Sequence, residues 1–234
     1  WTFFLTTITT KNIIENSFHT KVRRLLFLGS SCIYPKYSNQ PISEEELLTG
    51  SLEPTNQWYA LSKIAGIKLC ESLNRQYGFD AISLMPSNLY GRGDYYHHNN
   101  SHVIPALIRK FHQAKISNSK SVTCWGSGSP KREFLYVDDL ASACVFALEK
   151  WNPNLNSAPR DNIGEPLYFL NVGSGIDISI YHLAHLISKT IGYEGDILWD
   201  ITKPDGTPKK LLNIERIKKL GWRPETSLER GLKN

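Results

Sequence analysis

The sequence has few cysteines and no long apolar run. Its 234 residues include four cysteines, none of which forms a C-x-x-C pair or another metal-type spacing. We therefore predict reduced thiols and no metal site. No apolar run approaches about 18 residues, and we expect neither a membrane span nor a secretion signal. These absences favour a cytoplasmic protein.

The excess of basic charge is small. The formal net charge is +5, and the basic residues are scattered along the chain. The densest early cluster is Lys21, Arg23 and Arg24, which a solvated loop before a strand explains better than nucleic acid does. We predict no nucleic-acid partner, and the basic excess suits an anionic small substrate.

Short apolar runs alternate with helical patterns. Strands are predicted at 25–28, 81–85, 122–125, 169–172 and 196–199. Helices are predicted at about 1–20, 56–77, 102–115 and 179–191. Two more are predicted to end at about 151 and near 221. Gly78 is expected to end one helix and Ser179 to cap another. This alternation predicts an α/β fold with a parallel sheet, whereas residues 40–55 form a polar loop with a solvated turn at Glu44, Glu45 and Glu46.

Tyr59 and Lys63 are four residues apart on one predicted helix face, with Cβ atoms about 5–6 Å apart. A phenol ordinarily titrates near pH ~10. A fixed ammonium beside it favours the phenolate, so we expect a lowered pKa for Tyr59 and proton exchange with a substrate oxygen near neutral pH. Most isolated pairs of this kind are surface pairs, so the pair gains meaning only from its neighbours.

A polar turn, Gly29-Ser30-Ser31-Cys32, follows the first predicted strand about one βα unit before Tyr59. The carboxyl ends of parallel strands face the region where α/β sheets place their ligands. We therefore expect this turn to lie near Tyr59 and Lys63.

Six segments together resemble the extended short-chain dehydrogenase/reductase family, and within it the enzymes that epimerise and reduce GDP-4-keto-6-deoxy-mannose. They cover most of the chain in the expected order. They are LLFLGSSCIYPK (25–36), EPTNQWYALSKIAGIKLCES (53–72), MPSNLYG (85–91), SHVIPALIRKFH (101–112), WGSGSPKREFLYVDD (125–139) and KPDGTPKKLL (203–212).

The resemblance implies a Rossmann-like parallel sheet in residues 1–91, with residues 134–172 returning to it. A smaller α/β substrate-binding lobe is expected from residues 92–133 and 173–234. The implied ligands are NADP and a GDP-sugar, and many relatives are homodimers. No glycine-rich phosphate-binding turn is present and the chain begins without methionine. We therefore expect a fragment that lacks its first strands, binds cofactor weakly and has little activity alone.

The resemblance also implies roles for five side chains. Ser30, Tyr59 and Lys63 form a reductase triad: Ser30 binds the carbon-4 carbonyl, Tyr59 gives the proton and Lys63 binds the nicotinamide ribose. Cys32 and His102 exchange protons at carbons 3 and 5, which the neighbouring ketone acidifies. A thiol ordinarily titrates near ~8.5, so a nearby cation or dipole must favour its thiolate, while histidine titrates near ~6.5.

Further contacts follow from the resemblance. The expected cofactor contacts are Leu28, Gly29, Ser30, Ser31, Tyr59, Lys63, Pro86, Ser87, Asn88, Leu89 and His102. The expected substrate contacts are Lys110, Trp125, Arg132 and Lys210. Lys110 stands where the family commonly has arginine, so it keeps the charge but lacks the bidentate fork. His182 and His185 are expected to be surface residues and not a metal pair.

Two alternatives stay open at this point. One is another nucleotide-sugar 4-epimerase or 4,6-dehydratase of the same family. A dehydratase usually has an acidic trio such as Thr-Asp-Glu where this chain has Ser30-Ser31-Cys32, and a 4-epimerase needs no such thiol or histidine. The other alternative is an inactive nucleotide-binding fragment.

Overall fold

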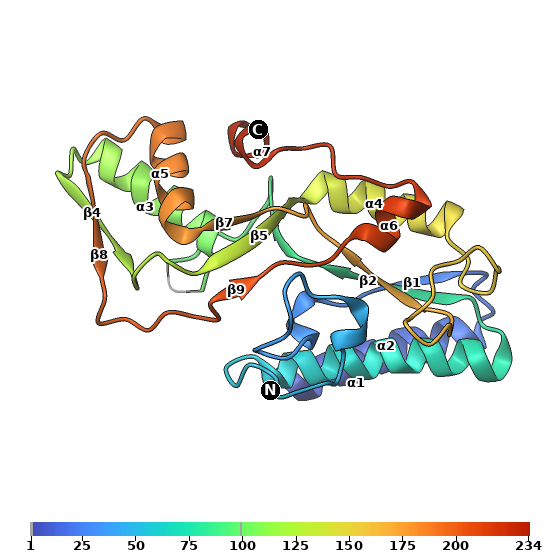
Figure 1. The fold of residues 1–234 in the computed structure, drawn as a ribbon. Helices are drawn as coiled ribbons and strands as arrows, with labels where there is room; N and C mark the ends of the chain where they lie inside the picture. The colour runs from blue at the N-terminus through green and yellow to red at the C-terminus, as the bar shows by residue number, and fades with distance from the viewer. Residues whose placement is uncertain (1, 99) are drawn as a thin grey trace.

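The computed structural model describes residues 2–98 and 100–234 and has a Rossmann-like α/β fold (Figure 1). Residues 1 and 99 lie outside the described residues, and the first of them belongs to the predicted helix 1–20. Three parallel strands, in the order β1 (Leu25–Leu28), β2 (Ala81–Pro86), β6 (Phe169–Val172), form the sheet of the larger lobe, which we call the larger sheet. Every residue of β2 is buried, as expected for a central strand covered on both faces.

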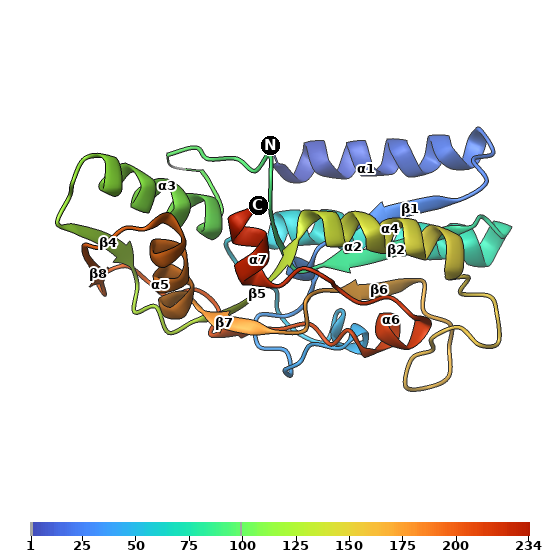
Figure 2. The same ribbon diagram turned by 90° about the horizontal axis from the view of Figure 1, so that it is seen from above.

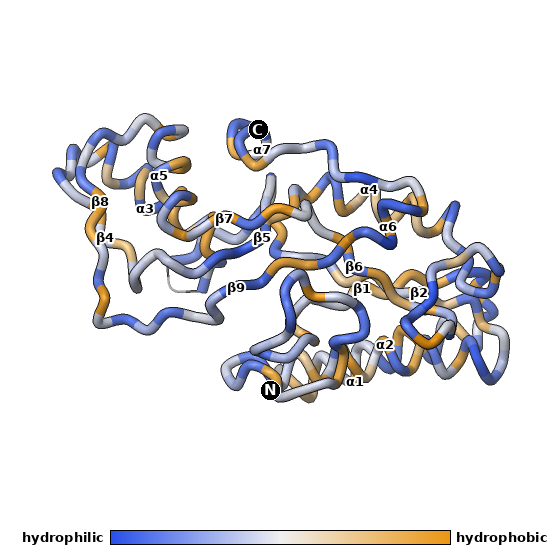
Figure 3. Tube along the Cα trace, in the orientation of Figure 1, coloured by the Kyte–Doolittle hydropathy of each residue, from blue (hydrophilic) through white to orange (hydrophobic). Residues whose placement is uncertain are grey.

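Helices cover both faces of this sheet (Figures 1 and 2). Two helices, α1 (Thr2–His19) and α2 (Gln57–Tyr77), lie side by side on one face. The other face carries α4 (Val137–Lys150) and α6 (Glu215–Leu220). Figure 3 shows hydrophobic stretches along β1 and β2, which this arrangement encloses.

A smaller lobe lies at the opposite end of the molecule (Figure 1). There β4 (Ser121–Trp125) pairs in parallel with β8 (Asp196–Asp200). The helices α3 (Val103–Ile116) and α5 (Ile180–Ile191) pack together beside this pair. The lobe therefore has its own buried cluster, which includes Phe111, Leu183 and Ile187.

Between the two regions runs β5 (Lys131–Tyr136). It pairs with β3 (Asn88–Tyr90) and β9 (Lys209–Lys210) in parallel and with β7 (Asp177–Ser179) in antiparallel. Successive side chains of a strand point to opposite faces. Accordingly Leu135 packs in the core of the larger sheet, whereas Phe134 and Tyr136 pack in the core of the smaller lobe.

The Glu133 carboxylate holds three chain segments together at this junction. It is 1% exposed, and it accepts hydrogen bonds from the backbone N–H of Gly175 at 2.7 Å and of Leu212 at 2.9 Å. Burial raises the pKa of Glu133 to about 7, against the opposing effect of these hydrogen bonds. The segment that follows β9 is thus fixed to β5 by a side chain as well as by strand pairing.

Most of the predicted elements are confirmed. The helix with Tyr59 ends at Gly78, whose φ of 69° is left-handed, and the Ser179 side chain caps α5. The strands β3, β5, β7 and β9 and the last helix α7 (Leu228–Lys233) were not predicted. After β9, the chain packs against the larger sheet through Leu212, Ile214, Ile217 and Trp222.

The prediction of a solvated turn at Glu44–Glu46 is wrong for its first residue. These residues form a short 3-10 helix, but Glu44 is 2% exposed. Its carboxylate accepts the Asn171 backbone N–H at 2.9 Å and lies 2.5 Å from an Arg216 guanidinium nitrogen. Arg216 also pairs with Glu45. The polar loop is therefore anchored in the core by a buried ion pair.

Replacing Arg216 with methionine should lower the free energy of unfolding by about 3–5 kcal/mol, because Glu44 would be buried without its partner. Denaturation in urea measures this loss. Burial raises the pKa of Glu44. A carboxyl group with a raised pKa destabilises the folded protein as pH rises, so the loss of unfolding free energy in Arg216→Met should be larger at about pH 8 than at about pH 5. Lys218→Met, which removes the exposed pair with Glu215, should cost less than about 1 kcal/mol. Equal losses in the two variants would contradict a buried ion pair.

Candidate active site

A tight turn follows β1 at the carboxyl edge of the larger sheet. Ser30 caps the short 3-10 helix η1 (Ser31–Ile33), and its hydroxyl oxygen accepts the Cys32 backbone N–H at 3.2 Å. A Cβ atom on Gly29 would lie 2.4 Å from the Met85 sulfur, so the chain approaches β2 too closely there for a larger residue. The turn is thereby held against the sheet with Ser30 and Cys32 at its start.

The first turns of α2 bring Tyr59 and Lys63 to the same edge. The Lys63 ammonium donates a hydrogen bond to the Leu28 carbonyl oxygen at 2.8 Å, and it lies 5.7 Å from the centroid of the Tyr59 ring. Burial lowers the pKa of Lys63. The lysine is thus anchored at the tip of β1, as the predicted convergence of the turn and the helix requires.

The prediction that Tyr59 has a lowered pKa is wrong. Burial of the phenol raises the pKa of Tyr59, negative charge on the neighbouring Cys32 raises it further, and the Ser30 hydroxyl opposes both. Lys63 is directed to a backbone carbonyl and does not offset the burial. Tyr59 therefore keeps its proton at neutral pH and is suited to act as an acid.

One cavity of about 780 Å³ brings together the candidate catalytic side chains Ser30, Cys32, Tyr59, Lys63 and His102. Its volume lies in the usual range for small-molecule sites. His102 is exposed and is the N-cap residue of α3, but its imidazole makes no capping hydrogen bond. The remaining predicted cofactor contacts also line this cavity: Leu28, Gly29, Ser31, Pro86, Ser87, Asn88 and Leu89.

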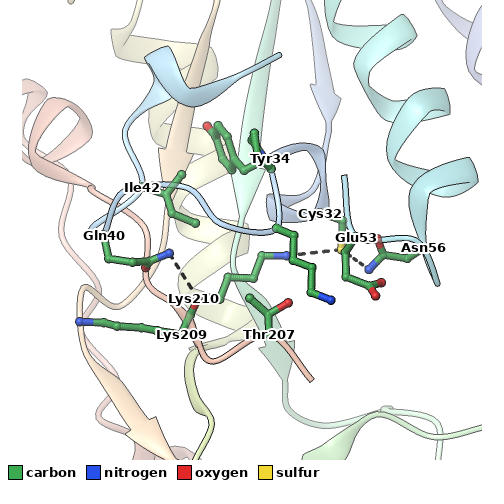
Figure 4. A pocket seen from close by; sticks show the side chains of 11 residues that line it. Cys32, Tyr34, Gln40, Ile42, Glu53, Asn56, Thr207, Lys209 and Lys210 are labelled. Carbon is green, nitrogen blue, oxygen red and sulfur yellow. Dashed lines mark hydrogen bonds between the residues drawn. The ribbon is translucent and has the colours of Figure 1, made fainter. Parts of the chain in front are cut away.

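The Cys32 sulfur also faces a second, smaller cavity of about 40 Å³ (Figure 4). Two side chains donate to this sulfur: the Asn56 amide at 3.6 Å and the Lys210 ammonium at 3.7 Å. Asn56 was not predicted, although its position three residues before Tyr59 places it on the same side of the helix start. Lys210 was predicted as a substrate contact, and its ammonium lies against Cys32.

The other predicted substrate contacts lie away from the larger cavity. The described residues that line the larger cavity do not include Lys110, Trp125 or Arg132. Lys110 donates to the Thr123 carbonyl oxygen at 3.2 Å and lies 5.4 Å from the Trp125 ring, which is 68% exposed. Lys203, which was not predicted, lies 5.7 Å from the same ring. Burial lowers the pKa of Arg132.

Comparisons with known proteins found relatives of the whole chain in sequence and in structure. A profile of the NAD dependent epimerase/dehydratase family matches residues 2–164. A GDP-L-fucose synthase from Sinorhizobium fredii is 54% identical over 94% of this chain and 66% of its own length. The chain thus spans about two thirds of the length of the curated relatives it matches.

Two solved structures from Campylobacter jejuni are similar over the whole chain. A GDP-6-OMe-4-keto-L-xylo-heptose reductase has a TM-score of 0.92 and 32% identity, covering 99% of this chain and 74% of the other. A GDP-mannoheptose C4 reductase with NADP bound has a TM-score of 0.86 and 31% identity, with the same coverage. Within the described residues, no helix is long and apolar enough to cross a bilayer.

Proposed function

The chain belongs to the NAD dependent epimerase/dehydratase family, and on that premise we propose that it converts GDP-4-keto-6-deoxy-mannose to GDP-L-fucose. The reaction epimerises carbons 3 and 5 and reduces carbon 4 with NADPH. The observation that carries the proposal is one cavity lined by a serine, tyrosine and lysine for reduction and by a cysteine and histidine for proton exchange. The similarity to a GDP-L-fucose synthase supports it.

The residues around the larger cavity fit the nicotinamide end of NADP. The Ser87 hydroxyl is buried and has no hydrogen-bond partner within the described residues, although it lines the cavity. Such a group is suited to a polar ligand atom. Leu28, Gly29 and Lys63 would line the ribose side, with Pro86 to Leu89 opposite. Bound there, NADPH supplies the hydride for carbon 4.

In the reduction, Ser30 and Tyr59 act on the carbon-4 oxygen. The Ser30 hydroxyl donates a hydrogen bond to the carbonyl and fixes its position. Tyr59 then donates its proton to the oxygen, which suits a phenol that burial keeps protonated at neutral pH. Lys63, fixed on the Leu28 carbonyl, orients the ribose and keeps positive charge beside the developing alkoxide.

In the epimerisation, Cys32 and His102 act on the two carbons beside the ketone. Cys32, as a thiolate, removes a proton from one face of the ring. His102 returns a proton on the other face. The two side chains come from different parts of the fold, because Cys32 follows β1 and His102 precedes α3. This separation supports an inversion, which needs donors and acceptors on opposite faces.

The remaining assignments extend the same proposal. Residues 1–91 and 134–172 hold the cofactor, and residues 92–133 and 173–234 hold the GDP-sugar. Lys110, Trp125, Arg132 and Lys210 contact that substrate, with Arg132 suited to a diphosphate. The exposed apolar side chains of Trp58 and Leu61 on α2 support a homodimer. Free thiols at all four cysteines suit a cytoplasmic location.

The mass of the product formed in D₂O tests this function. The enzyme is incubated with GDP-4-keto-6-deoxy-mannose and unlabelled NADPH. An epimerase-reductase gives a GDP-fucose carrying carbon-bound deuterium at both carbons 3 and 5. A reductase alone, the second candidate favoured by the similarity to two GDP-heptose reductases, consumes NADPH and leaves those positions unlabelled. A 4-epimerase has no net consumption of NADPH. Unlabelled product would exclude the epimerase half.

A further inference from the structure

A thiol needs help to act as a base at neutral pH, because an ordinary cysteine is then mostly protonated. Three cationic or titratable side chains near Cys32 could provide it. Lys63 is bound to the Leu28 carbonyl oxygen, and His102 is exposed at the start of α3. Lys210 alone among these three makes a hydrogen bond to the sulfur, at 3.7 Å.

The surroundings of Lys210 strengthen this contact. Burial lowers the pKa of Lys210, while the charge and hydrogen bond of Cys32 raise it. A buried ammonium without a partner would be costly, so the thiolate and the ammonium stabilise each other. The Asn56 amide donates to the same sulfur at 3.6 Å. Two donors therefore converge on the Cys32 sulfur.

Lys210 is also held firmly in place. In the pairing of β9 with β5, Lys210 lies opposite Arg132. The next two residues are fixed by side chains, because Gln40 accepts the Leu211 backbone N–H and Glu133 accepts that of Leu212, each at 2.9 Å. The position of the ammonium is thus set by the fold before any ligand binds.

The space around this contact is small. Figure 4 shows the Lys210 side chain extended toward Cys32 across the smaller cavity, with Glu53 and Asn56 beside the sulfur. A volume of about 40 Å³ holds one or two water molecules. In this arrangement the ammonium is directed to the thiol.

We propose that Lys210 is the positioning residue that holds Cys32 as a thiolate for proton exchange at carbons 3 and 5. The base role of Cys32 rests on the proposed function, whereas the ion pair does not. Other charged or titratable groups face the same region. Tyr59 and His102 line the larger cavity, Lys36, Glu53 and Lys209 line the smaller one, and Arg132 acts on Lys210.

The rate at which iodoacetamide alkylates Cys32 tests the ion pair without substrate or cofactor. Mass spectrometry of the Cys32 peptide measures the rate in the full chain as a function of pH. Lys210→Met should slow alkylation about tenfold at pH ~7 and leave it nearly unchanged at pH ~10, where the thiol ionises without help. Lys210→Arg should restore much of the rate. In the control, Lys209→Met, the neighbouring lysine that pairs with Asp177 is removed, and the rate should not change.

Two results would overturn the proposal. One is seen in the alkylation of Cys32 at neutral pH: either its rate is unchanged in Lys210→Met, or Lys209→Met slows it as much as Lys210→Met does. The other concerns the native chain: its ultraviolet thiolate absorbance at pH ~7 should exceed that of Cys32→Ser, and no difference refutes the ion pair even if Lys210→Met does not fold. Folding is followed by Cys70 and Cys124, which are buried and should stay unreactive. If the ion pair is present but deuterium exchange is not, the proposed function fails and the pair remains.

Discussion

Replacing Tyr59 with phenylalanine should slow reduction at carbon 4 by about a thousandfold, while exchange at carbons 3 and 5 continues. The change removes only the hydroxyl that donates the proton. Lys63 cannot take over this role, because its ammonium is bound to the Leu28 carbonyl oxygen. The rate of NADPH consumption with already epimerised substrate measures the reduction, and deuterium in the recovered ketone measures the exchange.

A tyrosine at the other end of the same helix gives the control. Tyr77 is 64% exposed near the end of α2, and Tyr77→Phe should keep both activities. If Tyr59→Phe reduced the substrate at the native rate, the phenol would not be the acid. If it lost both activities together, the hydroxyl would serve binding or folding and not proton transfer to one oxygen.

Replacing Cys32 with serine should give the opposite result to Tyr59→Phe, with exchange lost and reduction kept. Exchange at carbons 3 and 5 should fall by about a thousandfold, because an alcohol is a much weaker acid than a thiol and is not converted to its anion by a nearby ammonium. Reduction of already epimerised substrate should continue, since Ser30, Tyr59 and Lys63 are unchanged. Deuterium incorporation from D₂O and the rate of NADPH consumption measure the two halves.

Cys144→Ser is the matched control for this variant. Cys144 is partly buried against the core of the larger sheet and lines neither cavity at Cys32. Its replacement should leave exchange and reduction unchanged. Undiminished exchange in Cys32→Ser would exclude Cys32 as the base. The two opposite patterns, in Tyr59→Phe and Cys32→Ser, would separate the chemistry of one cavity into two halves.

The regular elements were predictable because their signals are local. Strands β1 and β6 are short apolar runs between polar turns, and Gly78 and Ser179 mark helix ends through their own conformational and capping preferences. By contrast, β7 and β9 have three and two residues. They form only because β5 offers free backbone groups on both edges, and this partner lies far away in the sequence.

The same distinction holds for the candidate site. The approach of the Ser30 turn to Tyr59 follows from parallel strands that end at one edge, and it was predicted. The raised pKa of Tyr59 depends on how deeply its neighbours cover it. The burial of Glu44 depends on Arg216, 172 positions away. Spacing within a motif carries no information about such partners, so these properties could be found only in the folded molecule.

The contact between Cys32 and Lys210 spans 178 positions. Ser30, Tyr59 and Lys63 lie within 33 positions of one another, since the second and third follow the first by 29 and 33 residues. As the chain leaves the ribosome, folding begins from its N-terminal part. A growing chain therefore completes the hydride-transfer side of the cavity first, and its thiol gains an ammonium only after about nine tenths of these 234 residues have been translated.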